Sequence, residues 1–265
     1  MPRFAANLSM LWPERPFLDR FEAAARAGFK AVEFLFPYEH PPEVIAERLR
    51  RHGLQLVLHN LPPGDWAAGE RGLACIPGRE AEFRAGVALA ARYARVLGTP
   101  RWHCMAGIRP PGVTEDEARA TWIANLRHAA AEARKLGIVV LVEPINTYDM
   151  PGYFVSRPRQ AVALIDAVGA DHVLLQYDIY HAQRMEGELA NTLAALLPRI
   201  GHLQLADTPG RHEPGTGEIN YRFLFEHIDR LGYSGWIGCE YRPLDETAGG
   251  TDRGLDWLRQ HGCSL

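Results

Sequence analysis

The chain has 265 residues, of which 47% are hydrophobic and 23% charged, and its formal net charge is −3. These values are typical of a globular protein with a large core, and they exclude a disordered chain or a small disulfide-bonded scaffold. The slightly acidic balance argues against nucleic acid as a partner, because proteins that contact phosphates carry a basic face.

The compartment is predicted from the cysteines and the apolar segments. The four cysteines are far apart and include no CxxC pair, which favours reduced thiols. The amino terminus lacks a signal-like apolar region, and no stretch approaches the ~20 apolar residues of a membrane span. We therefore expect a cytoplasmic protein without a membrane partner.

Eight short apolar runs predict β-strands along the whole chain. In chain order they cover residues 4–9, 31–36, 54–59, 101–105, 138–143, 173–178, 202–206 and 236–240. Runs such as IVVLV and HVLLQY suit strands that are buried on both faces, as in a parallel sheet.

Segments with helical periodicity lie between these strands. One begins with a capping box at Thr114, with Glu117 three residues later. Glycines that follow periodic segments and precede strands predict helix ends, at Gly28, Gly53, Gly98, Gly137 and Gly232.

Eight βα units of about 33 residues each match a (β/α)8 TIM barrel, an α/β fold that runs to about 250 residues as one unit. No Pro/Ser-rich linker interrupts the pattern, so we expect a single domain over residues 1–265. The competing doubly wound sheet usually carries a GxGxxG fingerprint after its first strand, which this chain lacks.

Polar side chains end four consecutive predicted strands: Glu143, Asp178, Gln204 and Glu240. Active-site groups of a barrel come from the carboxyl ends of its strands, so these four should meet at one mouth. Three carboxylates and an amide would repel one another without a cation, and hard oxygen ligands favour Mg²⁺ or Mn²⁺. The simpler alternative for any one acid is that it caps the next helix.

The loops after the strands supply candidates for substrate binding. His181 lies three residues after Asp178, and Arg211 lies in a Gly- and Pro-rich loop after Gln204, where it could hold a substrate carboxylate. Asn60 ends the third predicted strand and precedes a long loop with Trp66. That loop could be a lid over the site or a surface excursion with its tryptophan packed on the body.

Three further polar residues lie within predicted strands. We expect His103 and His202 to be interior residues with satisfied hydrogen bonds, because each falls inside an apolar run. Glu33 could point into the barrel, but the sequence assigns it no role.

Five long segments carry a resemblance to a known family: HNLPPGDWAAGERGLACIPGRE, LVEPINTYDMPGYF, LLQYDIYHAQRMEG, HLQLADTPGRHEPGTGEI and GWIGCEYRPL. They resemble the hydroxypyruvate isomerase family, within the xylose isomerase-like TIM-barrel superfamily, and the similarity spans nearly the whole chain. The resemblance implies a metal site of Glu143, Asp178, Gln204 and Glu240, with the two glutamates as the acid/base pair. His181 and Arg211 would contact substrate oxygens. Related epimerases usually have His where this chain has Gln204, which makes metal affinity less predictable.

The implied reaction converts 3-hydroxypyruvate to tartronate semialdehyde (2-hydroxy-3-oxopropanoate) through an enediolate. The same chemistry on a larger acid such as 2-oxo-tetronate, or 3-epimerisation of a ketose, fits the motifs as well. A metal-dependent nuclease of this superfamily would need more histidine ligands and a basic face. A non-catalytic barrel that binds sugars or acids would not need both glutamates. The sequence is compatible with a homo-oligomer.

Overall fold

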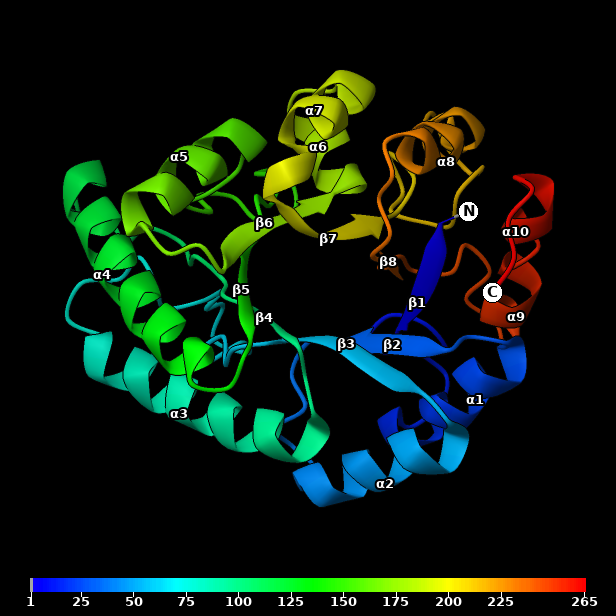
Figure 1. Cartoon of the computed structure of the whole chain (residues 1–265), viewed down its shortest axis with the longest axis horizontal. Coiled ribbons are helices and arrows are strands. Elements are labelled where there is room, and N and C mark those ends of the chain that lie inside the picture. Colours follow the sequence, from blue (N-terminus) through cyan, green and yellow to red (C-terminus); the bar gives the residue numbers. More distant parts are fainter. Residues whose placement is uncertain (1) are drawn as a thin grey trace.

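The computed structural model describes residues 2–265, which fold around a closed barrel of eight strands (Figure 1). Each strand pairs in parallel with its neighbours, and β1 pairs with β8 to close the barrel. The strands are β1 (Arg3–Asn7), β2 (Ala31–Phe34), β3 (Gln55–Asn60), β4 (Arg101–His103), β5 (Val139–Val142), β6 (Val173–Asp178), β7 (Ile200–Leu205) and β8 (Trp236–Cys239). The predicted TIM barrel is confirmed.

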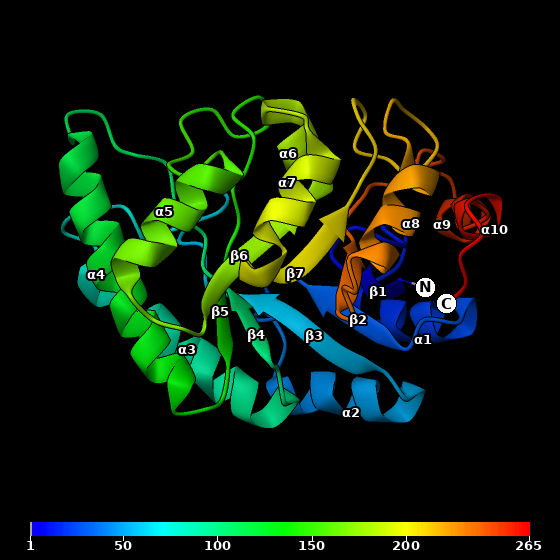
Figure 2. The same ribbon diagram turned by 45° about the horizontal axis from the view of Figure 1, so that its top comes forward.

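Helices surround the barrel and connect successive strands (Figure 2). They are η1 (Phe17–Asp19), α1 (Arg20–Ala27), α2 (Pro42–His52), α3 (Glu80–Leu97), α4 (Glu115–Arg134), α5 (Pro158–Val168), α6 (Ile179–Met185), α7 (Leu189–Leu196), η2 (Leu197–Arg199), α8 (Tyr221–Arg230), α9 (Gly250–Gly254) and α10 (Trp257–Gln260). No helix among residues 2–265 is long and apolar enough to cross a membrane.

The local signals in the sequence act as predicted. The Thr114 side chain accepts a hydrogen bond from the Glu117 backbone, and the Glu117 carboxylate accepts one in return, which completes the capping box of α4. All five predicted glycine stops have a positive φ, from +63° at Gly53 to +107° at Gly28. This left-handed backbone turns the chain from a helix end towards the next strand.

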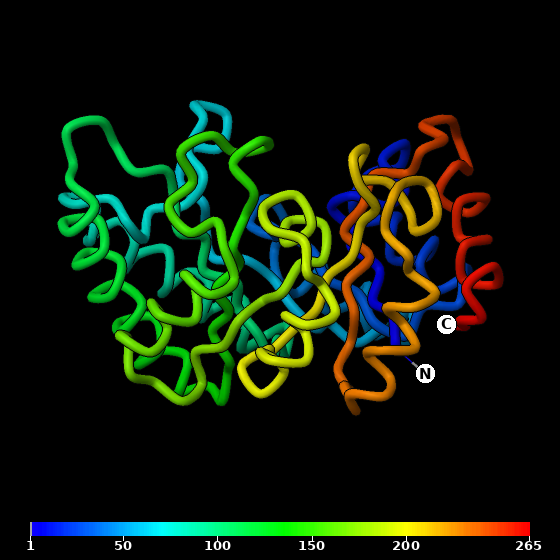
Figure 3. The backbone as a smooth tube through the Cα atoms, turned by 90° about the horizontal axis from the view of Figure 1, so that it is seen from above, coloured from blue at the N-terminus to red at the C-terminus, as the bar shows by residue number. Residues whose placement is uncertain are grey.

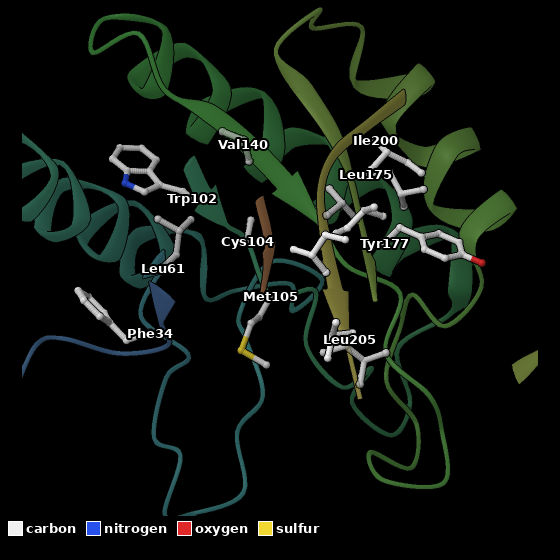
Figure 4. Packing of buried hydrophobic residues seen from close by; sticks show 14 of the residues in the cluster. Phe34, Leu61, Trp102, Cys104, Met105, Val140, Leu175, Tyr177, Ile200 and Leu205 are labelled. Atoms are coloured by element: carbon white, nitrogen blue, oxygen red, sulfur yellow. The ribbon is translucent and has the colours of Figure 1, made fainter. Parts of the chain in front are cut away.

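Most of the apolar core fills the layer between strands and helices. Figure 4 shows part of this core, including the side chains of Trp102, Val140 and Leu175, which are fully buried. A smaller cluster that includes Ala5, Val57 and Leu141 packs separately. The four cysteines are unpaired, and Cys104 and Cys239 are buried, as expected for reduced thiols.

The loops that follow the strands rise together on one side of the barrel (Figure 3). Since all eight strands run in the same direction, this side holds all of their carboxyl ends. The candidate site lies here, as it does in TIM barrels generally.

Candidate active site

A cavity of about 470 Å³ opens at the carboxyl ends of the strands. Six of the eight residues predicted to form the site line it: Asn60, Trp66, Glu143, His181, Arg211 and Glu240. Asp178 and Gln204 are buried close to these residues but do not line the cavity. Residues from strands and loops far apart in the chain therefore converge on one small space.

Three carboxylates of this group each leave one buried oxygen without a hydrogen-bond partner. The atoms are Glu143 Oε1, Asp178 Oδ2 and Glu240 Oε2. Burial raises the pKa of all three acids, that of Asp178 to about 6 and that of Glu240 to about 8. The charges of Glu240 and Asp178 add to the increase in the pKa of Glu143. The ionised form of this cluster is therefore disfavoured in the protein alone, and a bound cation would stabilise it.

The donor set fits a divalent cation. The oxygen donors are a carboxylate oxygen of Glu143 and one of Asp178, which lie within 4.8 Å of each other and of a His181 nitrogen, and all three side chains are buried. Glu240 adds a further unpartnered oxygen, and both this oxygen and that of Asp178 lie within 3.7 Å of the same guanidinium nitrogen of Arg211. Asp178 also caps α6, with its Oδ1 accepting from Tyr180 N at 2.8 Å, so helix capping and a site role are compatible in one residue.

Arg211 lies against the acids. Its Nη2 is 3.5 Å from Glu240 Oε2 and 3.7 Å from Asp178 Oδ2, and its side chain is only 14% exposed. Its guanidinium also lies 5.0 Å from the centre of the Tyr180 ring. Arg211 therefore compensates part of the acidic charge of the site.

The loop that carries Arg211 is built around Asp207. The Asp207 carboxylate accepts backbone hydrogen bonds from Thr208, Gly215, Gly217 and Ile219, at 2.9–3.0 Å. A Cβ at Gly217 would lie 1.8 Å from Thr208 O, so only glycine permits this close approach. The sequence analysis did not identify Asp207, although an acid at the start of a Gly- and Pro-rich loop is a typical turn signal.

The tautomer of His181 is set by Asn146. The backbone N–H of Asn146 donates to His181 Nδ1 at 3.3 Å, and the Asn146 Nδ2 lies 2.6 Å from the same nitrogen. Nδ1 is therefore the acceptor, and a neutral imidazole must carry its proton on Nε2. Burial lowers the pKa of His181 well below its usual value, which keeps the ring neutral. The Nε2–H faces Glu143 Oε1 and Asp178 Oδ2, each 3.6 Å away.

Replacing Asn146 with Asp tests this arrangement, because an acceptor would then face Nδ1 and draw the proton to it. We expect ¹⁵N spectra of histidine-labelled protein to show His181 protonated at Nδ1, together with a fall in turnover of about 10-fold or more. Asn191→Asp on the exposed face of α7 is the matched control and should change neither. An unchanged His181 spectrum in Asn146→Asp would show that another contact sets the tautomer.

A buried polar network lies inside the barrel next to the site. Glu33, fully buried, accepts hydrogen bonds from Asn7 Nδ2 at 3.0 Å and Gln204 Nε2 at 2.8 Å, and it pairs with His202 Nε2 at 2.7 Å. Gly238 makes room for it, since a Cβ there would lie 2.3 Å from Glu33 Oε1. Glu33 thus gains a structural role. The expectation for His202 is met only in part: the residue is buried and its Nε2 pairs with Glu33, but its Nδ1 has no hydrogen-bond partner.

Glu33 also orients the Gln204 amide. Because Gln204 Nε2 donates to Glu33, its Oε1 faces the other way, where it accepts from Gln176 Nε2 at 2.6 Å. Gln204 pairs in register with Asp178 of the neighbouring strand. The side chain of Gln204 thus has a fixed orientation, and its amide oxygen has one of its two lone pairs in use.

The expectation for His103 is wrong. His103 lines the cavity, neither ring nitrogen has a hydrogen-bond partner, and its Nδ1 lies 3.5 Å from Glu143 Oε2. The predicted strand ran to residue 105, whereas β4 ends at His103, so this side chain lies at the mouth and not within the barrel. Burial lowers the pKa of His103 to about 3, which makes it a neutral polar group of the site.

Further cavity residues were not predicted. Asp149 and Tyr180 line the cavity and are joined by a hydrogen bond from the Tyr180 hydroxyl to Asp149 Oδ2, at 2.9 Å. Asp149 also accepts from Asn146 Nδ2 at 3.1 Å. The signal for Asp149 in the sequence is the polar stretch NTYD shortly after Glu143, and Tyr180 lies in DIYH between Asp178 and His181.

The Trp66 loop combines features of both interpretations offered for it. Trp66 lines the cavity and is 38% exposed, yet its ring also packs on Phe36 with the ring centres 5.3 Å apart. Asn60 is buried at the end of β3, and its carbonyl accepts a hydrogen bond from the Tyr38 hydroxyl at 2.6 Å. The loop is therefore both a wall of the cavity and a packed surface element.

Comparison with known proteins agrees with this geometry. The family model described as "Xylose isomerase-like TIM barrel" matches residues 21–261. "Hydroxypyruvate isomerase" of Escherichia coli is 54% identical over 97% of this chain and 98% of its own length. "2-oxo-tetronate isomerase" of Cupriavidus necator is 53% identical over 98% of this chain and 99% of its own length. A solved structure described as "AP endonuclease, family 2" from Brucella melitensis is 48% identical with a TM-score of 0.94, and covers 98% of this chain and 99% of that one.

The chain belongs to the xylose isomerase-like TIM barrel family. Its full-length relatives make it an enzyme of the aldose–ketose isomerase type.

Proposed function

We propose that this enzyme interconverts a small 3-hydroxy-2-oxo acid and its 2-hydroxy-3-oxo isomer, with 3-hydroxypyruvate and 2-hydroxy-3-oxopropanoate as the first pair to test. The observation that carries the proposal is the pair of buried glutamates, Glu143 and Glu240, which line one cavity with an unpartnered oxygen each. The relative from Escherichia coli bears the name of this activity.

The glutamates serve as the acid/base pair. One carboxylate removes a proton from C3 of the substrate and the C2–C3 enediolate forms. The hydroxyl proton then passes from the oxygen on C3 to the oxygen on C2, and the other glutamate delivers a proton to C2, which leaves an aldehyde at C3 and a hydroxyl at C2. The pKa of Glu240, raised to about 8 by burial, suits this exchange, because a group that holds its proton near neutral pH can also give it up there. Burial raises the pKa of Glu143 in the same direction. Which glutamate acts first depends on the face on which the substrate binds.

His181 and Arg211 stabilise the charge that develops on the substrate oxygens. The Nε2–H of His181 points into the group of acids from the cavity wall, where it can donate to an oxygen on C2 or C3. Arg211 brings a permanent positive charge to the same space. Donors fixed in advance in a buried site are effective because they need no reorganisation during the reaction.

Glu143, Asp178, Gln204 and Glu240 would hold a divalent cation, with Mg²⁺ and Mn²⁺ favoured by their oxygen donors. His181 is not counted among the ligands, because its Nε2 carries a proton and its Nδ1 is occupied by Asn146. When bound, the ion would polarise the substrate carbonyl and stabilise negative charge on its oxygens.

A four-carbon 2-oxo-tetronate is the alternative substrate. A relative with that name is almost as similar to this chain, and the cavity has room for a fourth carbon. The proton transfer from C3 to C2 is the same.

A nuclease is disfavoured, because only His103 and His181 line the cavity among histidines of residues 2–265, and the net charge is negative. The paired glutamates equally disfavour a non-catalytic binding protein.

The test is to incubate the protein with Mg²⁺ or Mn²⁺ and, separately, hydroxypyruvate, 2-oxo-tetronate and neutral ketoses, and to identify the products by NMR. We expect conversion of at least one of the 2-oxo acids and slower or no conversion of the ketoses. Conversion of ketoses alone would reject the proposal in favour of an epimerase.

We further expect the enzyme to act in the cytoplasm, as its unpaired cysteines suggest.

A further inference from the structure

We propose that Arg71, in the loop after β3, binds the carboxylate of the substrate and thereby makes the site specific for 2-oxo acids over neutral sugars. This inference rests on the proposed function and assigns one residue to its substrate class. Arg71 lines the cavity together with Trp66. Both belong to the segment GDWAAGERG.

The Arg71 guanidinium is held in place by its own loop. It lies 3.9 Å from the centre of the Trp66 ring, and its Nη1 donates to the carbonyls of Trp66 at 3.0 Å and Glu70 at 2.7 Å. These contacts use the Nη1 nitrogen and one face of the planar guanidinium, so the hydrogens on Nη2 and Nε remain available to a ligand. A guanidinium fixed in this way loses little side-chain entropy when an anion binds.

The charge of Arg71 is not neutralised within the protein. Among residues 2–265, no carboxylate lies within 4 Å of its nitrogens. The adjacent acid, Glu70, is turned away: its Oε1 accepts from Arg79 Nη1 at 2.6 Å and its Oε2 from Asp65 N. Hydrogen bonding by Arg79 lowers the pKa of Glu70, which keeps it ionised in that pairing. Arg71 is left as a free cation beside the cavity.

The base of the loop is anchored to the barrel. Gly72, next to Arg71, has φ of +111°, and a Cβ there would lie 2.4 Å from Met105 O. Two residues further on, Asn125 Nδ2 donates to Ala74 O at 3.0 Å, and Cys75 N donates to Ala106 O at 2.9 Å. The loop therefore presents Arg71 from a fixed position.

Arg71 also lies on a different side of the cavity from the acids. Glu143 and Glu240 directly follow β5 and β8, and Asp178 ends β6, whereas Arg71 follows β3. In the closed barrel of eight strands, β3 is two strands from β5 and three strands from both β6 and β8. Arg211 is committed to the acids at 3.5–3.7 Å, so it is poorly placed to be the main carboxylate ligand. A 2-oxo acid would then lie with its hydroxyl and carbonyl towards the acids and its carboxylate towards Arg71.

Binding of an unreactive pair tests this directly: glycerate, which keeps the carboxylate, and its methyl ester, which is neutral. With cation-loaded protein, calorimetry should show that wild type prefers glycerate by at least about 10-fold and that Arg71→Met loses this preference. Arg71→Lys should retain part of it. Arg92→Met is the matched control, because Arg92 also lies over an aromatic ring, Tyr93, but on α3 outside the cavity.

Steady-state kinetics with hydroxypyruvate or 2-oxo-tetronate gives the second readout, in which Arg71→Met should raise KM far more than it lowers kcat. No preference in wild type, or an intact preference in Arg71→Met, overturns the inference. If wild type prefers glycerate through Arg71 but converts no 2-oxo acid, the carboxylate site stands and the proposed reaction fails. The two failures are therefore distinguishable.

Discussion

Glu143→Gln and Glu240→Gln are each expected to lower kcat for isomerisation by at least about 10²–10⁴-fold, the usual contribution of a positioned acid or base. Glutamine keeps the size of the side chain and can still offer an oxygen to a cation, but it can neither accept nor return the substrate proton. The measurement is the rate of product formation at saturating substrate, with circular dichroism to verify folding.

Glu226→Gln is the control for this pair, because it changes an exposed glutamate of α8 and should leave kcat unchanged. Near-normal turnover in either site variant would remove that glutamate from the proton transfer. A loss in one variant alone would reduce the pair to a single acid/base.

Removal of the divalent cation is the second change expected to have a large effect. Dialysis against a chelator should lower turnover about 100-fold or more, and Mn²⁺ or Mg²⁺ should restore it, because the buried acids are then no longer neutralised and the carbonyl no longer polarised. Metal analysis of the dialysed protein must accompany the assay. Full turnover by protein shown to be metal-free would contradict the predicted dependence of turnover on a divalent cation.

Asp178→Asn tests the cation site by changing one of its predicted ligands instead of removing the ion. Asparagine retains the oxygen that caps α6 but removes the charge of the unpartnered Oδ2. We expect binding of Mn²⁺, followed by the electron spin resonance of the free ion, to weaken at least about 10-fold while the fold persists. Asp207 offers no such control, since its carboxylate builds the Arg211 loop.

The barrel could be predicted because its signals are local. Buried parallel strands appear as short apolar runs, and the glycines that end the helices mark where each strand is about to begin. Every predicted strand overlaps an observed one, and the sixth, residues 173–178, has the observed bounds of β6. Glu143, Asp178 and Glu240 could be found for the same reason, since each stands at the end of an apolar run.

The rest of the site depends on where each strand ends and on which side chains face inward. His103 was misjudged because β4 ends two residues before the apolar pattern does. The role of Glu33 follows from barrel closure, which brings it to His202 and Gln204, 169 and 171 residues away. The charge of Arg71 becomes notable only when the pairing of Glu70 with Arg79 is seen.

The central claim is that a 2-oxo acid undergoes proton transfer between C3 and C2 in this cavity. The most direct measurement is NMR of hydroxypyruvate in D₂O with cation-loaded enzyme, in parallel with Glu143→Gln and Glu240→Gln. We predict that wild type exchanges the C3 protons for deuterium and forms 2-hydroxy-3-oxopropanoate. Neither glutamine variant should form this product at a comparable rate, and the variant that lacks the C3 base should also lose the exchange. Wild type that leaves C3 unexchanged and forms no product, with 2-oxo-tetronate equally inert, would contradict the account.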